Sequence, residues 1–540
     1  MKKLILIIVL MVNINAWEVN THRAINRVAI TKTSNLNSFL ENSGIKNTNY
    51  GSEIFEGYTN IITRHPITYF DYINKKYSND GVSEWRQTFD GFIRNYQDLI
   101  EAGSILEDAV YDTVPLSFNG RFNNHFYEAQ NNGHALTFGY GIRVNALKWG
   151  TNGAHVGAFF RENKYSYLNT LNYFLKGFTE SSPTDRKKYQ AKMLVGVGHL
   201  LHLMNDMTSP AHTRDDSHPL GDAMEVCGRG GESGNEHRGF RIEGNVIQDY
   251  LGILKSSGSI TLPSIPKYSK FSDFISQESY WVSTHFFSND TIFTKPLPSK
   301  NDTYEDFSEK KENIEKYYIK SYARDGVPLG TKLAIRVKSY IINALKEKYY
   351  KDDEISLKLG NSSVFQGDYT AIQDNARILI PRAIANARNF LDYFFRGQIS
   401  AEITYTTIVV KNISDTSLVA KDATIMRSTH SSGGAYSFRY EDDDGTRHPL
   451  YFTYDRSAGN SDFNDNTTQP NSPTNVLYPT IDLDSGDSLE AHIILDDASK
   501  RIIRTKKIIA IYYGDIGQKH ERGMAVCQVN NPQGVYATRD

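Results

Sequence analysis

The chain has 540 residues and a formal net charge of −2, from 60 lysines and arginines against 62 aspartates and glutamates. This balance excludes a protein held to nucleic acid by bulk positive charge, although a small, deep active site could still cut a phosphodiester chain. The length is sufficient for two or more domains with full hydrophobic cores.

The first 16 residues have the layout of a secretory signal peptide. Lys2 and Lys3 precede the apolar run Leu4 to Val12, and the small residue Ala16 follows. This run is too short to span a bilayer as a mature helix, and no later stretch is apolar enough to do so. We therefore predict a secreted or cell-surface protein whose mature chain begins at Trp17, with an uncleaved anchor as the alternative. Cleavage would free the α-amine of Trp17, which can bind a metal near neutral pH.

Residues 17 to 398 have mainly helical periodicity. Apolar residues recur at helical spacing between Tyr189 and Met207, and helices are also predicted at Leu329 to Tyr350 and at Ile378 to Phe395. Pro381 suits the first turn of the third helix, and Gly397 marks its end.

After Gly397 the sequence becomes rich in β-branched and aromatic residues separated by Gly, Asn and Asp. Strand-like runs are Ile403 to Val410, Val476 to Tyr478, His492 to Leu495 and Ile502 to Tyr513. The run Asp442 to Gly445 is predicted to be a solvated turn, with a calcium site as the alternative. We thus predict a mainly α fold, in which a helical domain at 17–398 precedes a β-sandwich-like domain at 399–540.

The pattern that carries most chemistry is His202-Leu-Met-Asn-Asp206, followed at once by His212. On a helix the spacing of four places an imidazole and a carboxylate on one face. Pro210 then ends the helix, and His212 is expected to return close to the pair. Two imidazoles and a carboxylate are typical zinc ligands. His199, nearly one turn before His202, is interpreted as an ordinary buried or surface histidine.

Further candidates flank this motif on both sides. Upstream lie Glu107 and Asp108, and then His125 in the run Asn-His-Phe-Tyr. Downstream, the short acidic segment from Thr213 to Glu225 contains His218 and could form a separate site with His212. The two cysteines, Cys227 and Cys527, could pair in an oxidising compartment.

His202-x3-Asp206-x5-His212, the mature Trp17 and the segment Asn124-His125-Phe126-Tyr127 together resemble the zinc-dependent phospholipase C family. That superfamily includes single-strand-specific zinc nucleases. The Trp17-x4-His22 spacing looks more like the nuclease branch, whereas the His125 context looks more like the bacterial phospholipases. The resemblance covers residues 17 to about 245 with good motifs and thins towards 398.

The resemblance implies an all-helical catalytic domain with three zinc ions. Asp108, His125, His202 and Asp206 would hold the first ion, with Glu107 and Asp112 as neighbouring carboxylates. Trp17, His22 and Asp206 would hold the second ion, and Asp206 would bridge the two. His212, His218 and Glu225 would hold the third ion. The spacing His218-x6-Glu225 departs from the family's His-x3-acid, and Glu236 with His237 is an alternative.

Asp108 and Asp206 would be the catalytic carboxylates, and zinc-activated water would attack phosphorus without a side-chain nucleophile. We predict first a secreted phospholipase C that acts on phosphatidylcholine-like lipids at a membrane surface, with no nucleotide cofactor. The β-rich region would help dock the enzyme to that surface. The alternatives are a single-strand-specific zinc nuclease and a zinc-stabilised surface-binding protein without activity.

Overall fold

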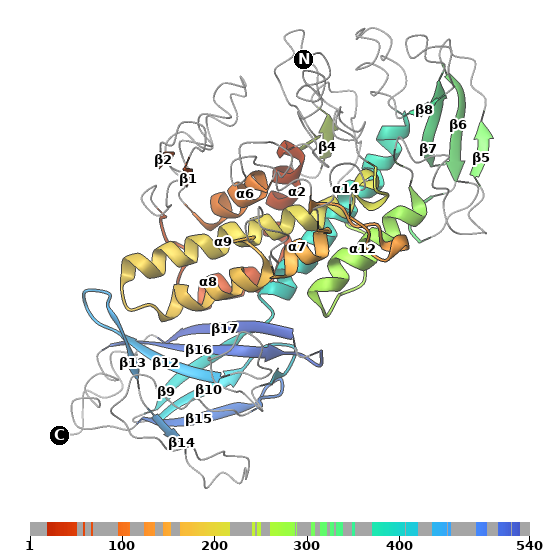
Figure 1. Cartoon of the computed structure of the whole chain (residues 1–540). Helices are drawn as coiled ribbons and strands as arrows, with labels where there is room; N and C mark the ends of the chain where they lie inside the picture. Colours follow the sequence, from red (N-terminus) through yellow and green to blue (C-terminus); the bar gives the residue numbers. More distant parts are fainter. Residues whose placement is uncertain are drawn as a thin grey trace, which may run out of the picture.

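A computed structural model of the chain shows a helical body with the C-terminal β-strands, β9 to β17, at one end (Figure 1). The structure describes residues 19–50, 58–59, 66–67, 95–107, 124–135, 144–152, 163–216, 240–243, 246–249, 260–286, 288, 304–307, 314–320, 325–328, 331–337, 348–350, 370–404, 407–419, 435–450, 452–454, 482–493, 506–519 and 521–529.

The longest helices of the body pack around α9 (Pro183–Asp206). Ser182 caps its first turn by accepting a hydrogen bond from the backbone N–H of Asp185, and Pro183 occupies the first helical position. Its second half, from Met193 to Asp206, is buried throughout. This burial is possible because three other helices cover it, namely α6 (Tyr96–Leu106), α8 (Tyr167–Thr179) and α14 (Thr370–Phe394).

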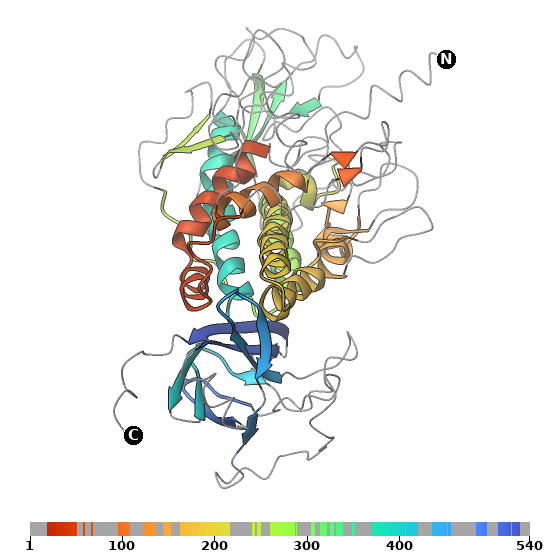
Figure 2. The same ribbon diagram turned by 90° about the vertical axis from the view of Figure 1, so that its left-hand side faces the viewer.

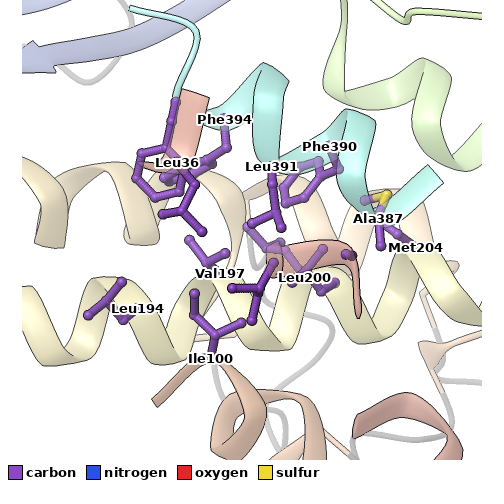
Figure 3. Close-up of a cluster of buried hydrophobic side chains, with 14 of the residues drawn as sticks. Leu36, Ile100, Leu194, Val197, Leu200, Met204, Ala387, Phe390, Leu391 and Phe394 are labelled. Atoms are coloured by element: carbon purple, nitrogen blue, oxygen red, sulfur yellow. The ribbon is translucent and has the colours of Figure 1, made fainter. Parts of the chain in front are cut away.

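Apolar side chains from several helices form one core along α9. Figure 3 shows side chains from α3, α6, α9 and α14 meeting there, including Leu36, Ile100, Val197, Leu200 and Phe390. The other helices that the structure describes are α2 (Val19–Lys32), α3 (Asn35–Asn42), η4 (Ala129–Asn131), α7 (Ala146–Asn152), α10 (Pro210–Thr213) and α12 (Phe271–His285).

Two glycines let the backbones of α6 and α9 touch. A Cβ atom on Gly103 would lie 2.0 Å from the carbonyl oxygen of Val195, and one on Gly198 would lie 2.1 Å from the carbonyl oxygen of Ile100. No larger residue fits either position without separating the helices. The contact places the C-terminal end of α6 directly against the last turns of α9.

The predicted helix at Leu329 to Tyr350 is wrong. Strands β7 (Lys332–Val337) and β8 (Lys348–Tyr350) lie there, in a four-stranded antiparallel sheet of order β5-β6-β7-β8 with β5 (Tyr304–Phe307) and β6 (Ile314–Lys320). Leu333, Ile335 and Val337 alternate with a period of two, and this pattern prevails over the longer helical spacing. Two short hairpins complete the described strands of this region: β1 (Tyr58–Thr59) with β2 (Pro66–Ile67), and β3 (Phe240–Glu243) with β4 (Val246–Asp249).

The helix predicted at Tyr189 to Met207 is present as α9. The one predicted at Ile378 to Phe395 begins earlier, as α14 from Thr370, so Pro381 lies inside the helix and not in its first turn. Packing against α2 and α9 holds α14 together there, although proline lacks the backbone N–H of an ordinary helical residue. After Phe394 the helix ends, and the first strand of the β-rich region begins at Ile399.

The β-rich region has two antiparallel sheets. The first has the order β14-β15-β10-β9, and in the second β16 pairs with β11, β12 and β17, while β12 continues to β13. The strands are β9 (Ile399–Thr404), β10 (Thr407–Asn412), β11 (Leu418–Val419), β12 (Ala435–Glu441), β13 (Arg447–Leu450), β14 (Phe452–Tyr454), β15 (Ser488–Ile493), β16 (Lys507–Ile516) and β17 (Glu521–Val529). Both sheets contribute to one apolar cluster, which includes Ile408 and Leu489 from the first and Phe438 and Ile508 from the second.

This region confirms, at a coarse level, the predicted order of a helical part followed by a β-rich part. The run at Ile403 to Val410 spans parts of β9 and β10, and the described residues of the runs at His492 to Leu495 and Ile502 to Tyr513 overlap β15 and β16. The predicted turn at Asp442 to Gly445 joins β12 to β13, and Lys506 and His448 form ion pairs with its carboxylates. The run at Val476 to Tyr478 and residue Cys227 lie outside the described residues, while Cys527 is buried in β17.

The sheet that contains β16 and β17 packs directly on the helical body (Figure 2). Ile509, Ile511, Met524 and Val526 of β16 and β17 belong to the helical core cluster. Polar contacts also cross this boundary: Glu521 accepts hydrogen bonds from the Tyr393 hydroxyl at 2.5 Å and from the Phe271 backbone N–H at 3.1 Å. The domain division at residue 398 stays a prediction: the β-rich part has an apolar cluster of its own, and its strands β16 and β17 also contribute to the helical core.

Candidate metal centre

The last turns of α9 carry the centre of the site. His202 and Asp206 lie one turn apart on the helix, and both side chains are fully buried. The helix ends at Asp206, and Pro210 begins the short helix α10 four residues later. As a result His212 lies on α10, within reach of the carboxylate that ends α9.

Four imidazoles surround the Asp206 carboxylate. Its Oδ1 atom lies 3.2 Å from Nε2 of His22, and its Oδ2 atom lies 2.9 Å from Nδ1 of His125. The same Oδ2 lies 3.3 Å from Nε2 of His202 and 3.7 Å from Nδ1 of His212. These histidines come from α2, the segment before η4, α9 and α10, and all four are fully buried.

Backbone carbonyl groups fix two of these rings. Nδ1 of His202 lies 2.7 Å from the carbonyl oxygen of Ser104, and Nδ1 of His212 lies 3.1 Å from that of His125. Because a carbonyl oxygen only accepts, each Nδ1 must carry the proton. Nε2 of each ring is then left with a lone pair, which is the form in which histidine binds a metal.

Ring stacking adds a second constraint. The His22 and His202 rings are stacked, with centroids 3.7 Å apart and planes 17° apart. Phe126 stacks on His212 at 4.1 Å and 12°. The imidazole planes are therefore set by packing as well as by hydrogen bonds.

Asparagines connect His22 to α6. The Asn205 amide lies 3.4 Å from Nδ1 of His22 and donates to Oδ1 of Asn26 at 3.0 Å, and Asn26 in turn donates to the Ser104 hydroxyl at 2.8 Å. Asn124, which precedes His125 in the sequence, does not belong to this chain of asparagines: its Oδ1 accepts a hydrogen bond from the backbone N–H of Val144.

The charges of the site are strongly coupled. Burial alone would raise the pKa of Asp206, but the imidazoles of His202, His212 and His125 outweigh burial and hold that pKa well below its usual range. Burial alone would lower the pKa of His125, but the carboxylates of Asp206 and Glu107 raise it above the ordinary value of 6.5. Asp206 is thus an ionised carboxylate that draws positive charge to its neighbours.

The donor set fits a metal ion. His22, His202 and Asp206 each offer a ligand atom within 4.8 Å of the other two, and so do His125, Asp206 and His212. Imidazole nitrogen combined with carboxylate oxygen favours zinc over the hard cations, which prefer oxygen alone. Asp206 belongs to both groups, so its carboxylate is common to the two sets of possible ligands.

The structure brings together five of the predicted site residues, listed here in chain order: His22, His125, His202, Asp206 and His212. The other four lie outside the described residues, and their role as ligands stays a prediction: Trp17, Asp108, His218 and Glu225. His237, Glu236 and Asp112 lie outside them too. His212 lies beside Asp206 and His125, whereas the sequence places it in a separate third site.

Sequence reasoning assigned no role to two buried side chains next to this cluster: it named Glu107 only as a neighbouring carboxylate of Asp108 and interpreted His199 as an ordinary buried or surface histidine. Glu107 lies 3.4 Å from Nε2 of His125 and makes a close contact with Nδ1 of His199. One signal was available: His199 lies three residues before His202, on the same side of α9. The distance of 92 residues between Glu107 and His199 hid their pairing.

A second group of possible ligands lies nearer the surface. Glu128, His134 and Asp215 offer ligand atoms within 4.8 Å of one another, and the His134 side chain is 48% exposed. Burial lowers the pKa of the adjacent Arg214 to about 10, while Glu128 and Asp216 act in the opposite direction. Because this guanidinium already balances part of the negative charge, the buried cluster around Asp206 is the stronger metal site.

Comparison with known proteins finds only a weak similarity to solved structures. No family model and no curated protein match the sequence. The alpha toxin from Clostridium absonum is similar at 10% identity and a TM-score of 0.24, over 83% of this chain and 90% of the toxin. An alpha-toxin from an avian strain of Clostridium perfringens is similar at 11% identity and a TM-score of 0.22, over 86% and 98%. The functional conclusion therefore rests on the site and not on this likeness.

Within the part of the chain that the structure describes, no helix is both long and apolar enough to cross a bilayer.

Proposed function

We propose that the protein is a secreted zinc-dependent phosphodiester hydrolase, and specifically a phospholipase C that cleaves phosphatidylcholine-like lipids. The observation that carries the proposal is the buried Asp206 carboxylate with four imidazoles around it. Zinc in such a site supplies Lewis acidity toward a phosphoryl oxygen and makes water nucleophilic near neutral pH.

Some residues would bind the metal ions directly, and others orient those ligands. Asp206 would bridge two ions, with His22 and His202 on one side and His125 and His212 on the other. The carbonyl oxygens of Ser104 and His125 orient His202 and His212, as described above. Burial of all five side chains strengthens every charge interaction among them, because little water is present to screen it.

The lipid substrate follows from the sequence motifs, since the described geometry fits phosphodiester chemistry in general. In this proposal Trp17, Asp108, His218 and Glu225 complete a set of three zinc sites, and the signal peptide directs the chain out of the cell. The β-rich region, which packs on the helical core, would present the enzyme to the membrane surface.

Release of phosphorylated head group from phosphatidylcholine vesicles tests the proposal. The zinc-loaded chain that begins at Trp17 should release head group, and a chelator should abolish this release. His202→Ala should lower the rate by a factor on the order of 100 or more, because it removes a metal ligand.

The matched control is His285→Ala, since His285 is also a buried helical histidine but contacts Trp281 and Asp325. It should keep the wild-type rate.

Cleavage of single-stranded DNA without lipid turnover would replace the phospholipase with the nuclease. Bound zinc without turnover of either substrate would leave a non-catalytic binding protein, and a chain that binds no zinc would overturn the proposal.

A further inference from the structure

Glu107 is a fully buried acidic residue directly after the last turn of α6. Because α6 and α9 are in close contact at Gly103 and Gly198, Glu107 lies beside the candidate metal centre. Its neighbour Asp108 is the residue that the sequence predicts as a ligand, so Glu107 has no role in the site described so far.

Three ring nitrogens lie around the Glu107 carboxylate. Its Oε1 atom accepts a hydrogen bond from Nε1 of Trp149 at 2.6 Å and lies 3.4 Å from Nε2 of His125. Its Oε2 atom contacts Nδ1 of His199. The His199 ring is in turn stacked on Tyr165, with centroids 4.3 Å apart and planes 8° apart. Trp149 and His199 therefore hold the carboxylate in place from two sides.

The two nitrogens of His125 face two different carboxylates. Nε2 points at Glu107, while Nδ1 lies 2.9 Å from Oδ2 of Asp206. A proton kept on Nε2 by Glu107 leaves the Nδ1 lone pair directed at the centre. A histidine that binds a metal through one nitrogen commonly donates its other N–H to a carboxylate, which fixes the ring and makes it a better ligand.

We infer that Glu107 is a positioning residue, which orients His125 for metal binding and is itself held by Trp149 and His199. The inference rests on the proposed metal centre and assigns to Glu107 a role distinct from that of Asp108. It also gives His199 a function, as the second anchor of the carboxylate, in place of the ordinary buried histidine that the sequence suggested.

Zinc affinity and the spectrum of the cobalt-substituted protein test the inference. Zinc affinity of the full mature chain is measured by competition with a chelating dye, and the visible absorption of bound Co²⁺ reports the ligand geometry. Glu107→Gln should weaken zinc binding by about 10- to 100-fold and change the cobalt spectrum, because the amide cannot accept from all three donors. Glu107→Asp should recover part of the loss.

Glu278→Gln is the matched control. Glu278 is also fully buried, but it pairs with Arg382 and Tyr268 and contacts none of the four histidines around Asp206. This variant should lower the thermal stability of the metal-free chain and leave the zinc affinity and the cobalt spectrum unchanged.

Trp149→Phe serves as a second, milder variant if Glu107→Gln does not fold, since it removes only the indole donor and keeps an aromatic ring. It should weaken zinc binding by less than Glu107→Gln does. Wild-type zinc affinity and cobalt spectrum in Glu107→Gln, or in Trp149→Phe where it stands in, would overturn the inference while the metal centre stands. Failure of the wild-type chain to bind zinc would overturn the metal centre and this inference together.

Discussion

Among single residues, Asp206 determines the electrostatics of the site. It is fully buried, its pKa lies well below the usual range, and its two oxygens face imidazoles from four segments. A buried carboxylate with such neighbours stays ionised and favours either protons or a cation next to it. In the metal-free chain, the raised pKa of His125 lets a proton on that ring supply positive charge, and metal binding must displace this proton.

The raised pKa of His125 predicts how metal binding depends on pH. Its folded-state pKa lies above the unfolded value of 6.5, so its contribution to the stability of the metal-free chain is complete below 6.5 and is lost as pH rises through the folded value. Zinc needs the neutral ring. The gain in melting temperature on adding zinc should therefore grow between about pH 6 and about pH 8. An equal gain at both pH values would contradict the assignment.

Asp206→Asn should destabilise the metal-free chain most at mildly acidic pH. The folded pKa of Asp206 is lowered, so its contribution is present above the unfolded value of 3.8 and is lost only as pH falls through the folded value. Removing the carboxylate leaves the buried His125 imidazolium without its Asp206 partner, which costs about 3–5 kcal/mol. Denaturant unfolding should show a larger loss near pH 6 than near pH 8, because the positive charge on His125 decreases as pH rises. A loss that does not vary with pH would speak against the coupling.

Among the secondary-structure elements, the close contact of α6 with α9 positions the site. It brings Ser104 to His202 and Glu107 to His125 and His199, and it depends on two glycines. The carbonyl groups that meet these glycines belong to helix backbones, which cannot move aside as a flexible side chain can.

Gly198→Ala tests the contact. The new Cβ atom would lie 2.1 Å from the carbonyl oxygen of Ile100, so the helices must separate. Although alanine is otherwise the better helix former, we expect a net loss of about 1–3 kcal/mol in the free energy of unfolding and a weaker affinity for zinc. Gly177→Ala is the control, because its Cβ atom would come no closer than 3.0 Å to Cγ and 3.1 Å to the backbone nitrogen of Gln190, which lies far along α9 from the site. Unchanged zinc affinity in Gly198→Ala would show that the site does not need this contact.

In the whole molecule, the β-rich region stabilises the helical body. Met524 and Val526 of β17 lie in the helical core, and Glu521 binds both α12 and α14 through Phe271 and Tyr393. The two parts are therefore expected to unfold together, although each has strands or helices of its own.

Met524→Ala measures this coupling. Met524 is fully buried between the two parts, and its truncation should cost about 2–5 kcal/mol. Calorimetry should show one transition, shifted as a whole to lower temperature. Two separate transitions, with only one of them shifted, would contradict the coupled unfolding of the helical and β-rich parts.

The sequence predicts the helical centre of the site well, because His202 and Asp206 are neighbours on one helix and their geometry follows from its period. The helix at Leu329 to Tyr350 was mistaken, since Leu333, Ile335 and Val337 alternate with a period of two within a run that also fits helical spacing. Pro381 was mistaken for a first-turn residue because tertiary packing, which no local pattern contains, extends α14 to Thr370. The pairing of Glu107 with His199 was not predicted, because only the approach of two helices at glycines brings them together.

The central claim is that Asp206 bridges a metal centre, and zinc titration of the metal-free mature chain tests it most directly. Elemental analysis after the titration gives the number of ions held by the wild-type chain and by Asp206→Asn. We predict at least two tightly bound zinc ions per wild-type chain, from the two donor groups that share this carboxylate, and the loss of both in the variant. Full zinc content in Asp206→Asn, or none in the wild-type chain, would contradict the account.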